Sequence, residues 1–291
     1  MHYSEILYRP PQEYATPLLE ITQGCTHNTC RFCTMYRESP FRMTPLAIVE
    51  EDLQELAECV PQATRLYFTG GNPFALSFAN LKARLELVRK YLPQVREIAM
   101  NARIDDITPK SDEELTALRS LGVTELYIGQ ESGDDATLTL VGKGITAADI
   151  RRECRRLEKA GILYWSTFLN GVTDRSLSHQ HALNTAEVFN SLHQKAIAIT
   201  SFTMFPGTPL AEDAATGHFT PVSEEERLEE LLLFIESLEV EADIWTSPTS
   251  AIRLLGHLPE DREAMMGQLI EMLTHLDETA LTDRRKNIQH L

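Results

Sequence analysis

The sequence predicts an α/β fold of about six strand–helix units, which could close a partial barrel or form an open sheet. We expect the partial (β/α)6 TIM-like barrel, with a short helical C-terminal extension. Short apolar runs rich in β-branched and aromatic residues alternate about six times with longer segments of helical periodicity. Such alternation is typical of parallel strands joined by right-handed crossovers. The unusual motifs of the chain also fall directly after the predicted strands, where parallel α/β folds place their ligand sites.

The individual elements follow from local signals. Ser111 is followed by Glu114 and Ser223 by Glu226, which is the spacing of a capping box at a helix start. Gly122 lies where a helix is expected to end. The expected strands are 18–22, 65–69, 97–101, 125–130, 163–169 and 196–204. The expected helices are 45–59, 78–91, 111–121, 147–160, 177–194 and 223–238.

The pattern changes after the last of these helices. We expect residues 1–242 to form the partial barrel and residues 243–291 to form a C-terminal helical cap that is not an independent domain. Within the cap, 245–258 is predicted to be turn and loop, 260–276 an amphipathic helix, and 280–291 a frayed polar end. Trp245 is expected either to close the bottom of the barrel or to cover the substrate.

Composition limits the kinds of partner. The chain has 291 residues with 43 acidic and 27 basic side chains, a formal charge of −16. This balance argues against a nucleic-acid partner, because such proteins usually present a basic face to the phosphates. No apolar run approaches the ~20 residues that span a bilayer. The first nine residues lack the basic and apolar regions of a signal peptide, so we expect a cytoplasmic protein without a membrane partner.

Three of the five cysteines lie within nine residues, in the segment Cys25-Thr-His-Asn-Thr-Cys30-Arg-Phe-Cys33. We call residues 25–33 the cysteine loop. Three thiolates on one loop can bind three irons of a [4Fe–4S] cluster and leave the fourth iron for another ligand. Zinc is the alternative, but a structural zinc site needs four ligands, and His27 lies too close to Cys25 for easy tetrahedral geometry. The two remaining cysteines, Cys59 and Cys154, are expected to be buried in helices.

Together with three further motifs, the cysteine loop resembles the radical S-adenosylmethionine (radical SAM) superfamily, over roughly residues 16–240. The branch it resembles includes oxygen-independent coproporphyrinogen III oxidase-like and methylthiotransferase-like proteins. The motifs are Thr69-Gly-Gly-Asn-Pro73, Glu125-Leu-Tyr-Ile-Gly-Gln-Glu-Ser-Gly133 and Phe205-Pro-Gly-Thr-Pro-Leu210, each at the end of a predicted strand. Two features depart from the usual pattern. Four residues rather than three separate the first two cysteines, and Asn72 replaces an acidic residue.

The resemblance implies two cofactors, a [4Fe–4S] cluster and S-adenosylmethionine (SAM). An electron from the cluster would cleave SAM, and the resulting 5′-deoxyadenosyl radical would abstract hydrogen from an unidentified small-molecule substrate. An electron donor such as flavodoxin or ferredoxin would be a partner. The implied metal ligands are Cys25, Cys30 and Cys33. The implied SAM-binding residues are Phe32, Gly70, Gly71, Asn72, Glu131, Arg151, Asn170, Met204, Phe205 and Gly207.

Several alternatives remain open from the sequence. Gly70 and Gly71 also suit an ordinary tight turn, and Glu131 could instead form a salt bridge with Arg103 or with the basic group at Arg151. At the level of the whole protein, the first alternative is a carrier of a cluster or of haem that keeps the fold without turnover. The second is a zinc-stabilised interaction module.

Overall fold

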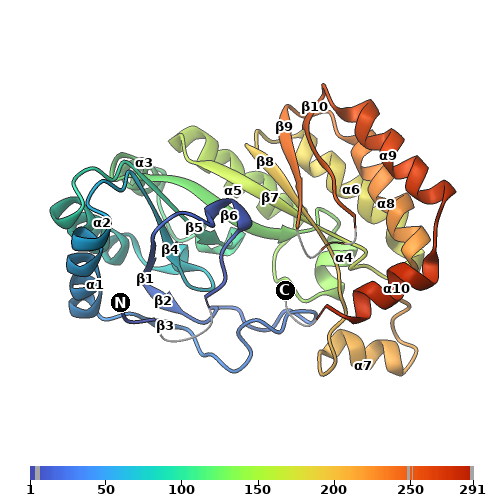
Figure 1. Ribbon diagram of the computed structural model, residues 1–291, viewed down its shortest axis with the longest axis horizontal. Helices are drawn as coiled ribbons and strands as arrows, with labels where there is room; N and C mark the ends of the chain where they lie inside the picture. Colours follow the sequence, from blue (N-terminus) through green and yellow to red (C-terminus); the bar gives the residue numbers. More distant parts are fainter. Residues whose placement is uncertain (4–6, 248–249, 251, 289–291) are drawn as a thin grey trace. The chain divides into compact units, whose positions relative to one another are not determined.

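The computed structural model describes residues 1–3, 7–247, 250 and 252–288, which form two compact units (Figure 1). Unit 1 comprises Met1–Asn28, Tyr36–Gly129 and Arg152–Tyr164. Unit 2 comprises Thr29–Met35, Gln130–Arg151 and Trp165–Leu291. In both units parallel strands alternate with helices, which confirms the predicted α/β class. Among the described residues, no helix is long and apolar enough to cross a membrane.

Unit 1 is built on parallel strands in the order β1, β4, β5, β6. Leu19 lies opposite Phe68, and Phe68 lies opposite Met100 in the next strand. All three side chains are fully buried, so this row belongs to the core of the unit. The strands are β1 (Leu18–Glu20), β4 (Arg65–Thr69), β5 (Glu97–Ala102) and β6 (Val123–Glu131), with a separate antiparallel pair, β2 (Thr22–Gln23) and β3 (Arg42–Met43). The helices are α1 (Leu46–Cys59), α2 (Phe78–Tyr91), α3 (Asp112–Ser120), the later part of α5 (Ala147–Ala160), and the 3-10 turns η1 (Pro11–Glu13), η2 (Pro73–Ala75) and η3 (Ile104–Asp106).

Two of the predicted helix starts have the expected caps. The Ser111 side chain accepts a hydrogen bond from the Glu114 N–H, and Glu114 in turn accepts from the Ser111 N–H, at the start of α3. The same reciprocal pair, Ser223 and Glu226, begins α8 (Glu224–Ser237). Each box satisfies backbone N–H groups that have no partner within the helix. Gly122 follows α3 with φ +112°, a conformation that favours glycine.

Unit 2 is built on β7, β8 and β9, which are parallel, with β10 antiparallel to β9 at the end of the row. Helices α6 and α8 pack on one face of these strands, where Phe168 of β7 stacks on Phe234 of α8 with ring centroids 4.0 Å apart. The strands are β7 (Leu163–Asn170, which begins in unit 1), β8 (Ala196–Ser201), β9 (Ala242–Thr246) and β10 (Leu255–Leu258). The helices are α4 (Asp135–Leu140), η4 (Arg175–Leu177), α6 (Ser178–Asn190), α7 (Pro209–Ala215), α8, α9 (Arg262–Thr274) and α10 (Glu278–Lys286).

The structure differs from the sequence prediction at three places near the C-terminus. The segment 245–258 was expected to be a loop, but it contains the end of β9 and all of β10. Residues 278–286 form a helix instead of a frayed end, because the Asp277 side chain caps its start and Arg285 pairs with Glu224. β8 ends at Ser201 rather than at residue 204, since Pro206, Gly207 and Pro209 favour a turn over a continued strand.

Two smaller differences concern the first strand and the cysteines. The expected strand 18–22 is divided into β1 and β2, which belong to different sheets. Cys154 is buried as predicted, but Cys59, the last residue of α1, is exposed. Its position at the end of the helix removes it from the apolar face that faces the core, which is formed by Val49, Leu53 and Leu56.

Candidate functional site

The Cys25 end of the cysteine loop lies in unit 1 and is fixed by backbone contacts. Cys25 forms an isolated bridge with Pro40, and the Asn28 side chain donates to the Tyr36 carbonyl at 2.6 Å. Gly24 adopts φ +65°, and a Cβ built there would lie 2.3 Å from the Ser39 carbonyl oxygen. Only glycine can therefore occupy this position without displacing the neighbouring backbone.

Gly71, in the motif after β4, packs directly against the same segment. Its N–H donates to the Gly24 carbonyl at 3.0 Å. A Cβ built at Gly71 would lie 2.2 Å from that oxygen and 2.9 Å from the Cys25 Cα. At Gly70, with φ +138°, a Cβ would lie 2.1 Å from the Thr22 hydroxyl oxygen. The two glycines thus have a packing reason within the protein, besides the predicted approach to SAM.

Asn72 is 1% exposed, and its amide connects the cysteine loop to the segment after β5. Its Oδ1 accepts the Thr26 N–H at 3.0 Å, and its Nδ2 donates to the Thr26 hydroxyl at 2.7 Å and to Asp106 at 2.9 Å. Both donor hydrogens of the amide are therefore used. Burial raises the pKa of Asp106 to about 6 despite hydrogen bonds from the Arg103 N–H and from Asn72. Nearby, burial lowers the pKa of Lys110 to about 8.

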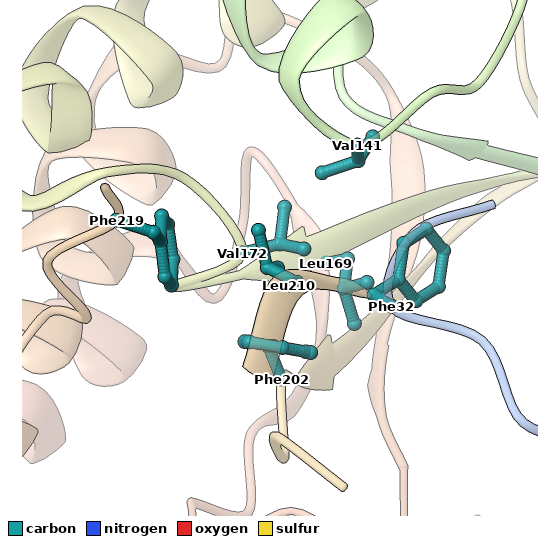
Figure 2. Packing of buried hydrophobic residues seen from close by; sticks show 7 residues of the cluster. All are labelled: Phe32, Val141, Leu169, Val172, Phe202, Leu210 and Phe219. Carbon is teal, nitrogen blue, oxygen red and sulfur yellow. The ribbon is translucent and has the colours of Figure 1, made fainter. Parts of the chain in front are cut away.

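The Cys30–Cys33 end of the loop lies in unit 2 and is fixed by apolar packing. Phe32 is 9% exposed and belongs to a cluster that includes Leu169 at the end of β7 and Phe202 after β8 (Figure 2). The Phe32 and Phe202 rings meet edge to face with centroids 6.4 Å apart. Cys30, Cys33 and Met204 are half-buried against this cluster. The full cluster is Phe32, Val141, Leu169, Val172, Phe202, Leu210 and Phe219.

Arg31, between the second and third cysteines, adds polar contacts on this side. Its N–H donates to the Val141 carbonyl at 2.9 Å, and its carbonyl accepts the Leu210 N–H at 3.1 Å. Its guanidinium pairs with Asp213 on α7 and donates to the Leu140 carbonyl. Sequence reasoning did not single out Arg31, because a lone arginine in a loop carries no signal of which segments it joins.

Glu131, the last residue of β6, has a strained backbone and polar partners in unit 2. It has φ +68°, which is uncommon for a residue with a side chain and often marks a functional position. Its N–H donates to the Thr167 hydroxyl at 3.1 Å, and its carboxylate accepts from the same hydroxyl at 3.2 Å. It forms an ion pair with Lys143 at 3.1 Å.

Lys143 is the residue of this group that the sequence analysis missed. Its side chain is only 6% exposed, so a buried cation sits beside the Glu131 carboxylate. Burial raises the pKa of the Cys33 thiol, and the positive charge of Lys143 acts in the opposite direction and favours the thiolate. The sequence feature that could have drawn attention to Lys143 is its position between Gly142 and Gly144. Both glycines have positive φ in the loop between α4 and α5.

Other predicted site residues have partners of their own in unit 2. Arg151 pairs with Glu187 of α6 at 2.8 Å and is half-buried. Asn170 is fully buried, and its Nδ2 donates to Glu230 at 3.0 Å, while its Oδ1 has no hydrogen-bond partner among the described residues. Phe205 is half-buried in the turn before α7, and Gly207 in the same turn is exposed with φ +77°.

The donor set of the loop suits an iron–sulfur cluster. All five cysteines are thiols rather than disulfides, and the three of the loop are half-buried. Thiolates are the usual ligands of such clusters. Within the described part of the chain, no three His, Cys, Asp or Glu side chains are already arranged as a metal site. The residue types of the loop therefore fit the cluster, and the ligand roles of the three cysteines remain a prediction.

Comparison with known proteins agrees with this donor set. A family model described as the radical SAM superfamily matches residues 19–188. The chain is 24% identical over 221 residues to the haem chaperone HemW of Bacillus subtilis strain 168, a match that covers 72% of this chain and 56% of that protein. The chain thus spans about half the length of this curated relative.

Solved structures share the fold. Coproporphyrinogen III oxidase (HemN) from Escherichia coli matches with a TM-score of 0.56 and 15% identity, over 76% of this chain and 51% of that one. The methyltransferase TsrM from Kitasatospora setae, which holds cobalamin and a [4Fe–4S] cluster, matches with a TM-score of 0.55 and 21% identity, over 69% of this chain and 37% of that one. These matches confirm the predicted partial-barrel class. Because the family model covers more than half of the residues, and its members use a [4Fe–4S] cluster and SAM, we conclude that the chain belongs to the radical SAM superfamily.

Proposed function

We propose that this protein is a radical SAM enzyme that cleaves SAM reductively and abstracts hydrogen from a small-molecule substrate. Cys25, Cys30 and Cys33 would hold the cluster, which supplies the electron for the cleavage when it is bound. The observation that carries the proposal furthest is the polar group of Glu131, Lys143 and the Cys33 thiol in unit 2. Glu131 has a strained backbone and pairs with the buried Lys143, and both charges act on the Cys33 thiol, an arrangement that suits a functional position.

Each residue of this group has a chemical task in the proposal. Glu131 would accept hydrogen bonds from the ribose hydroxyls of SAM, since a carboxylate is an acceptor with several lone pairs. Lys143, a buried cation in contact with that carboxylate, suits the carboxylate of the methionyl part. Arg151, which the resemblance placed among the SAM-binding residues, stays a prediction for SAM. Phe32 and its apolar cluster would exclude water from the cluster-binding side of the loop.

The remaining predicted SAM contacts extend the same proposal. Asn170 has a buried Oδ1 that no described residue of the protein bonds, which suits a donor from a ligand. Asn72 retains one acceptor lone pair for the SAM ammonium group, because its other polar positions are already used. The proposal also keeps Gly70, Gly71, Met204, Phe205 and Gly207 as residues whose backbone or side chain would meet SAM.

The direct test is anaerobic production of 5′-deoxyadenosine. The protein is reconstituted with iron and sulfide, reduced, given SAM, and the product is quantified together with iron per chain. Cys30→Ala is expected to abolish the product and most of the iron. Cys59→Ala is the matched control, because Cys59 is an exposed thiol outside the loop. Full iron content in the Cys30 variant would contradict the ligand assignment.

A second test separates SAM binding from cluster binding. Glu131→Gln removes the charge but keeps the shape, so we expect weaker SAM binding, by about tenfold, with iron per chain nearly unchanged. Equal losses of iron and of SAM affinity would instead indicate that Glu131 is structural.

A carrier of haem or of a cluster is the second candidate function. It is favoured by one observation, the similarity of this chain to the haem chaperone HemW of Bacillus subtilis. The two candidates differ in a simple assay: a carrier binds haem tightly in a defined ratio and forms no 5′-deoxyadenosine even with a full cluster. For the enzyme, an electron donor such as flavodoxin or ferredoxin and a cytoplasmic location remain part of the proposal.

A further inference from the structure

Unit 1 contains a cavity that lies outside the candidate functional site. Its volume is about 570 Å³, which is within the size range of small-molecule sites. Two neighbouring helix-to-strand turns form its wall, one from the end of α2 into β5 and the other from the end of α3 into β6. All of its lining residues belong to unit 1. We call it the arginine cavity, because Arg89, Arg96 and Arg119 line it.

Hydrogen bonds within the protein hold the two turns side by side. The Ile98 N–H donates to the Gly122 carbonyl at 2.8 Å, which joins the start of β5 to the residue before β6. The Arg89 guanidinium donates to the Ser120 carbonyl, and α2 packs against α3. The wall of the arginine cavity is therefore formed before any ligand binds, as is usual for small-molecule sites.

The three arginines of the cavity form no ion pair with a carboxylate among the residues that the structure describes. Their hydrogen bonds go to backbone carbonyls instead. Arg119 donates from Nε to the Gly161 carbonyl at 2.8 Å, and Arg96 donates to two carbonyls of its own turn. A guanidinium has five N–H donors, so each arginine keeps at least three for a ligand. All three side chains are exposed, so a ligand in solution can reach them.

The charge of the arginine cavity is opposite to that of the whole chain. The chain has 43 acidic and 27 basic side chains, yet three guanidiniums line this one cavity. One carboxylate, Glu97, also lines it, but that carboxylate pairs with Arg65 at 2.9 Å. The cavity thus has an excess of positive charge. Like charges that converge repel each other, and a bound anion would remove this repulsion.

Support of the helix ends explains only part of this arrangement. Arg89 and Arg119 both lie in the last turn of a helix, where basic side chains interact favourably with the helix dipole and with the last carbonyls. This role does not account for Arg96, which lies outside the helices. It also does not account for the cavity that the three side chains share.

The arginine cavity lies at the opposite end of the strands from the SAM-binding motif of unit 1. It adjoins the starts of β5 and β6, whereas Gly70 and Gly71 follow the end of β4, the parallel neighbour of β5. At about 3.3 Å per residue, the five residues of β4 separate the two ends by about 15 Å. A ligand in the cavity would therefore not contact this motif. In parallel α/β barrels the reaction occurs at the carboxyl ends of the strands, so the cavity is a separate binding site.

We propose that the arginine cavity binds a small polyanion, a molecule that carries two or more phosphate or carboxylate groups. A guanidinium matches either group with two parallel hydrogen bonds, and such charge-assisted pairs are stronger than neutral ones. Three guanidiniums around one cavity favour a ligand with several anionic groups over a single carboxylate. The inference goes beyond the proposed function, because it uses none of the residues assigned to the cluster or to SAM.

Titration calorimetry tests the inference directly. The reconstituted protein is titrated separately with pyrophosphate, with tricarballylate and with acetate at low ionic strength. We expect one molecule of at least one polyanion to bind per chain, at least about tenfold more tightly than acetate and more weakly at higher salt. Binding of pyrophosphate alone would indicate a phosphorylated ligand, and binding of tricarballylate alone a polycarboxylate. Acetate binding of equal affinity, or no saturable binding of either polyanion, would overturn the inference.

Variants locate the binding. Arg96→Gln and Arg119→Gln each remove a charge-assisted pair, so we expect the affinity for the polyanion to fall about tenfold in each. Arg96→Lys keeps the charge but not the planar fork and should cost about threefold. Arg155→Gln is the control, because Arg155 is an exposed arginine of unit 1 that does not line the cavity. Its affinity should stay within about twofold.

Two outcomes of the variant series would contradict the inference. Unchanged affinity in both Arg96→Gln and Arg119→Gln would place the ligand elsewhere. A loss in Arg155→Gln as large as that in Arg96→Gln would show a general attraction of anions to exposed arginines rather than a site.

A further control separates the arginine cavity from the cysteine loop. Pyrophosphate can bind iron, so iron per chain is measured before and after each titration, and the titration is repeated with Cys30→Ala. Retained affinity in this variant would support the arginine cavity, because Cys30 takes no part in it. Affinity that is lost together with the iron would place the polyanion at the cysteine loop and overturn the inference.

Discussion

The two ends of the cysteine loop are held by different physical means. At the Cys25 end, in unit 1, glycines let backbone segments approach so closely that no side chain fits at Gly24 or Gly71. At the Cys30–Cys33 end, in unit 2, Phe32 is inserted into an apolar cluster and Arg31 bonds to the surrounding backbone. At the Cys25 end, one added atom should be enough to disrupt the backbone contacts. At the Cys30–Cys33 end, the loss of stability should grow with the number of atoms removed from the apolar cluster. The four predictions below test this difference, from the largest expected effect to the smallest.

Removal of the Phe32 ring should have the largest effect on stability. Phe32→Ala is expected to lower the free energy of unfolding by about 3–4 kcal/mol, since truncation of a buried phenylalanine leaves a cavity. Phe32→Leu should cost about 1 kcal/mol, because most of the volume is kept. Denaturant unfolding of the two variants measures the ratio of their losses in the free energy of unfolding. Similar costs for leucine and alanine would contradict a volume-dependent contact.

Gly71→Ala, which adds one methyl group, tests the Cys25 end of the loop. The new Cβ would lie 2.2 Å from the Gly24 carbonyl oxygen, so we expect a loss of about 3 kcal/mol and a fall in iron per chain after reconstitution. Gly267→Ala is the matched control, since no atom lies within 4 Å of a Cβ at that position in α9. The control should be neutral or more stable by up to about 1 kcal/mol. If both variants behave alike, the Gly71 contact does not fix the loop.

Asp106, which anchors Asn72 behind the Cys25 end, should make stability depend on pH. Its folded pKa of about 6 lies above the ordinary value of 3.8, so the folded state binds more protons than the unfolded state between these values. Stability contributed by this group is therefore present below pH 4 and is lost as the pH rises to about 6. The loss is about 3 kcal/mol, because one pKa unit corresponds to about 1.4 kcal/mol.

The matched variant for this prediction is Asp106→Asn, which keeps an acceptor for the Arg103 and Asn72 donors but does not titrate. Unfolding is measured for both proteins between pH 4 and pH 7, below the range where Lys110 titrates with a pKa of about 8. The variant should become the more stable protein as the pH rises. A difference that stays constant with pH would show that the carboxyl does not titrate in this range.

Most of the fold was predictable because its signals are local. The bounds of β4, α2 and α5 match the prediction residue for residue, since alternating apolar patterns and capping residues act within one element. The hairpin of β9 and β10 was missed because the segment 245–258 contains Pro248 and Gly256, residues that favour turns, and because its pairing depends on a partner strand. α10 was missed for a similar reason: its buried Arg285 is stabilised by Glu224, which is 61 residues away.

The candidate site was predictable in its donors but not in its ion pairs. The three cysteines and Glu131 stand out by spacing and by position after a strand. Lys143 does not, because nothing in a Gly-Lys-Gly segment tells which carboxylate the lysine will meet. For Asn72, the sequence showed only that an amide replaces an acidic residue. The structure instead shows an amide that joins Thr26 to Asp106.

The ion pair between Arg31 and Asp213 should contribute least of the contacts that hold the Cys30–Cys33 end. The two side chains are 34% and 27% exposed, so solvent screens their attraction, and such pairs contribute about 0.5 kcal/mol. Asp213→Asn should thus lower the free energy of unfolding by about this amount at low salt and by less at 0.5 M salt, with iron per chain unchanged. A loss as large as that of Phe32→Ala would show that charge, rather than packing, fixes this end of the loop. The Cys25 end would then be held by close backbone contacts and the Cys30–Cys33 end by an ion pair.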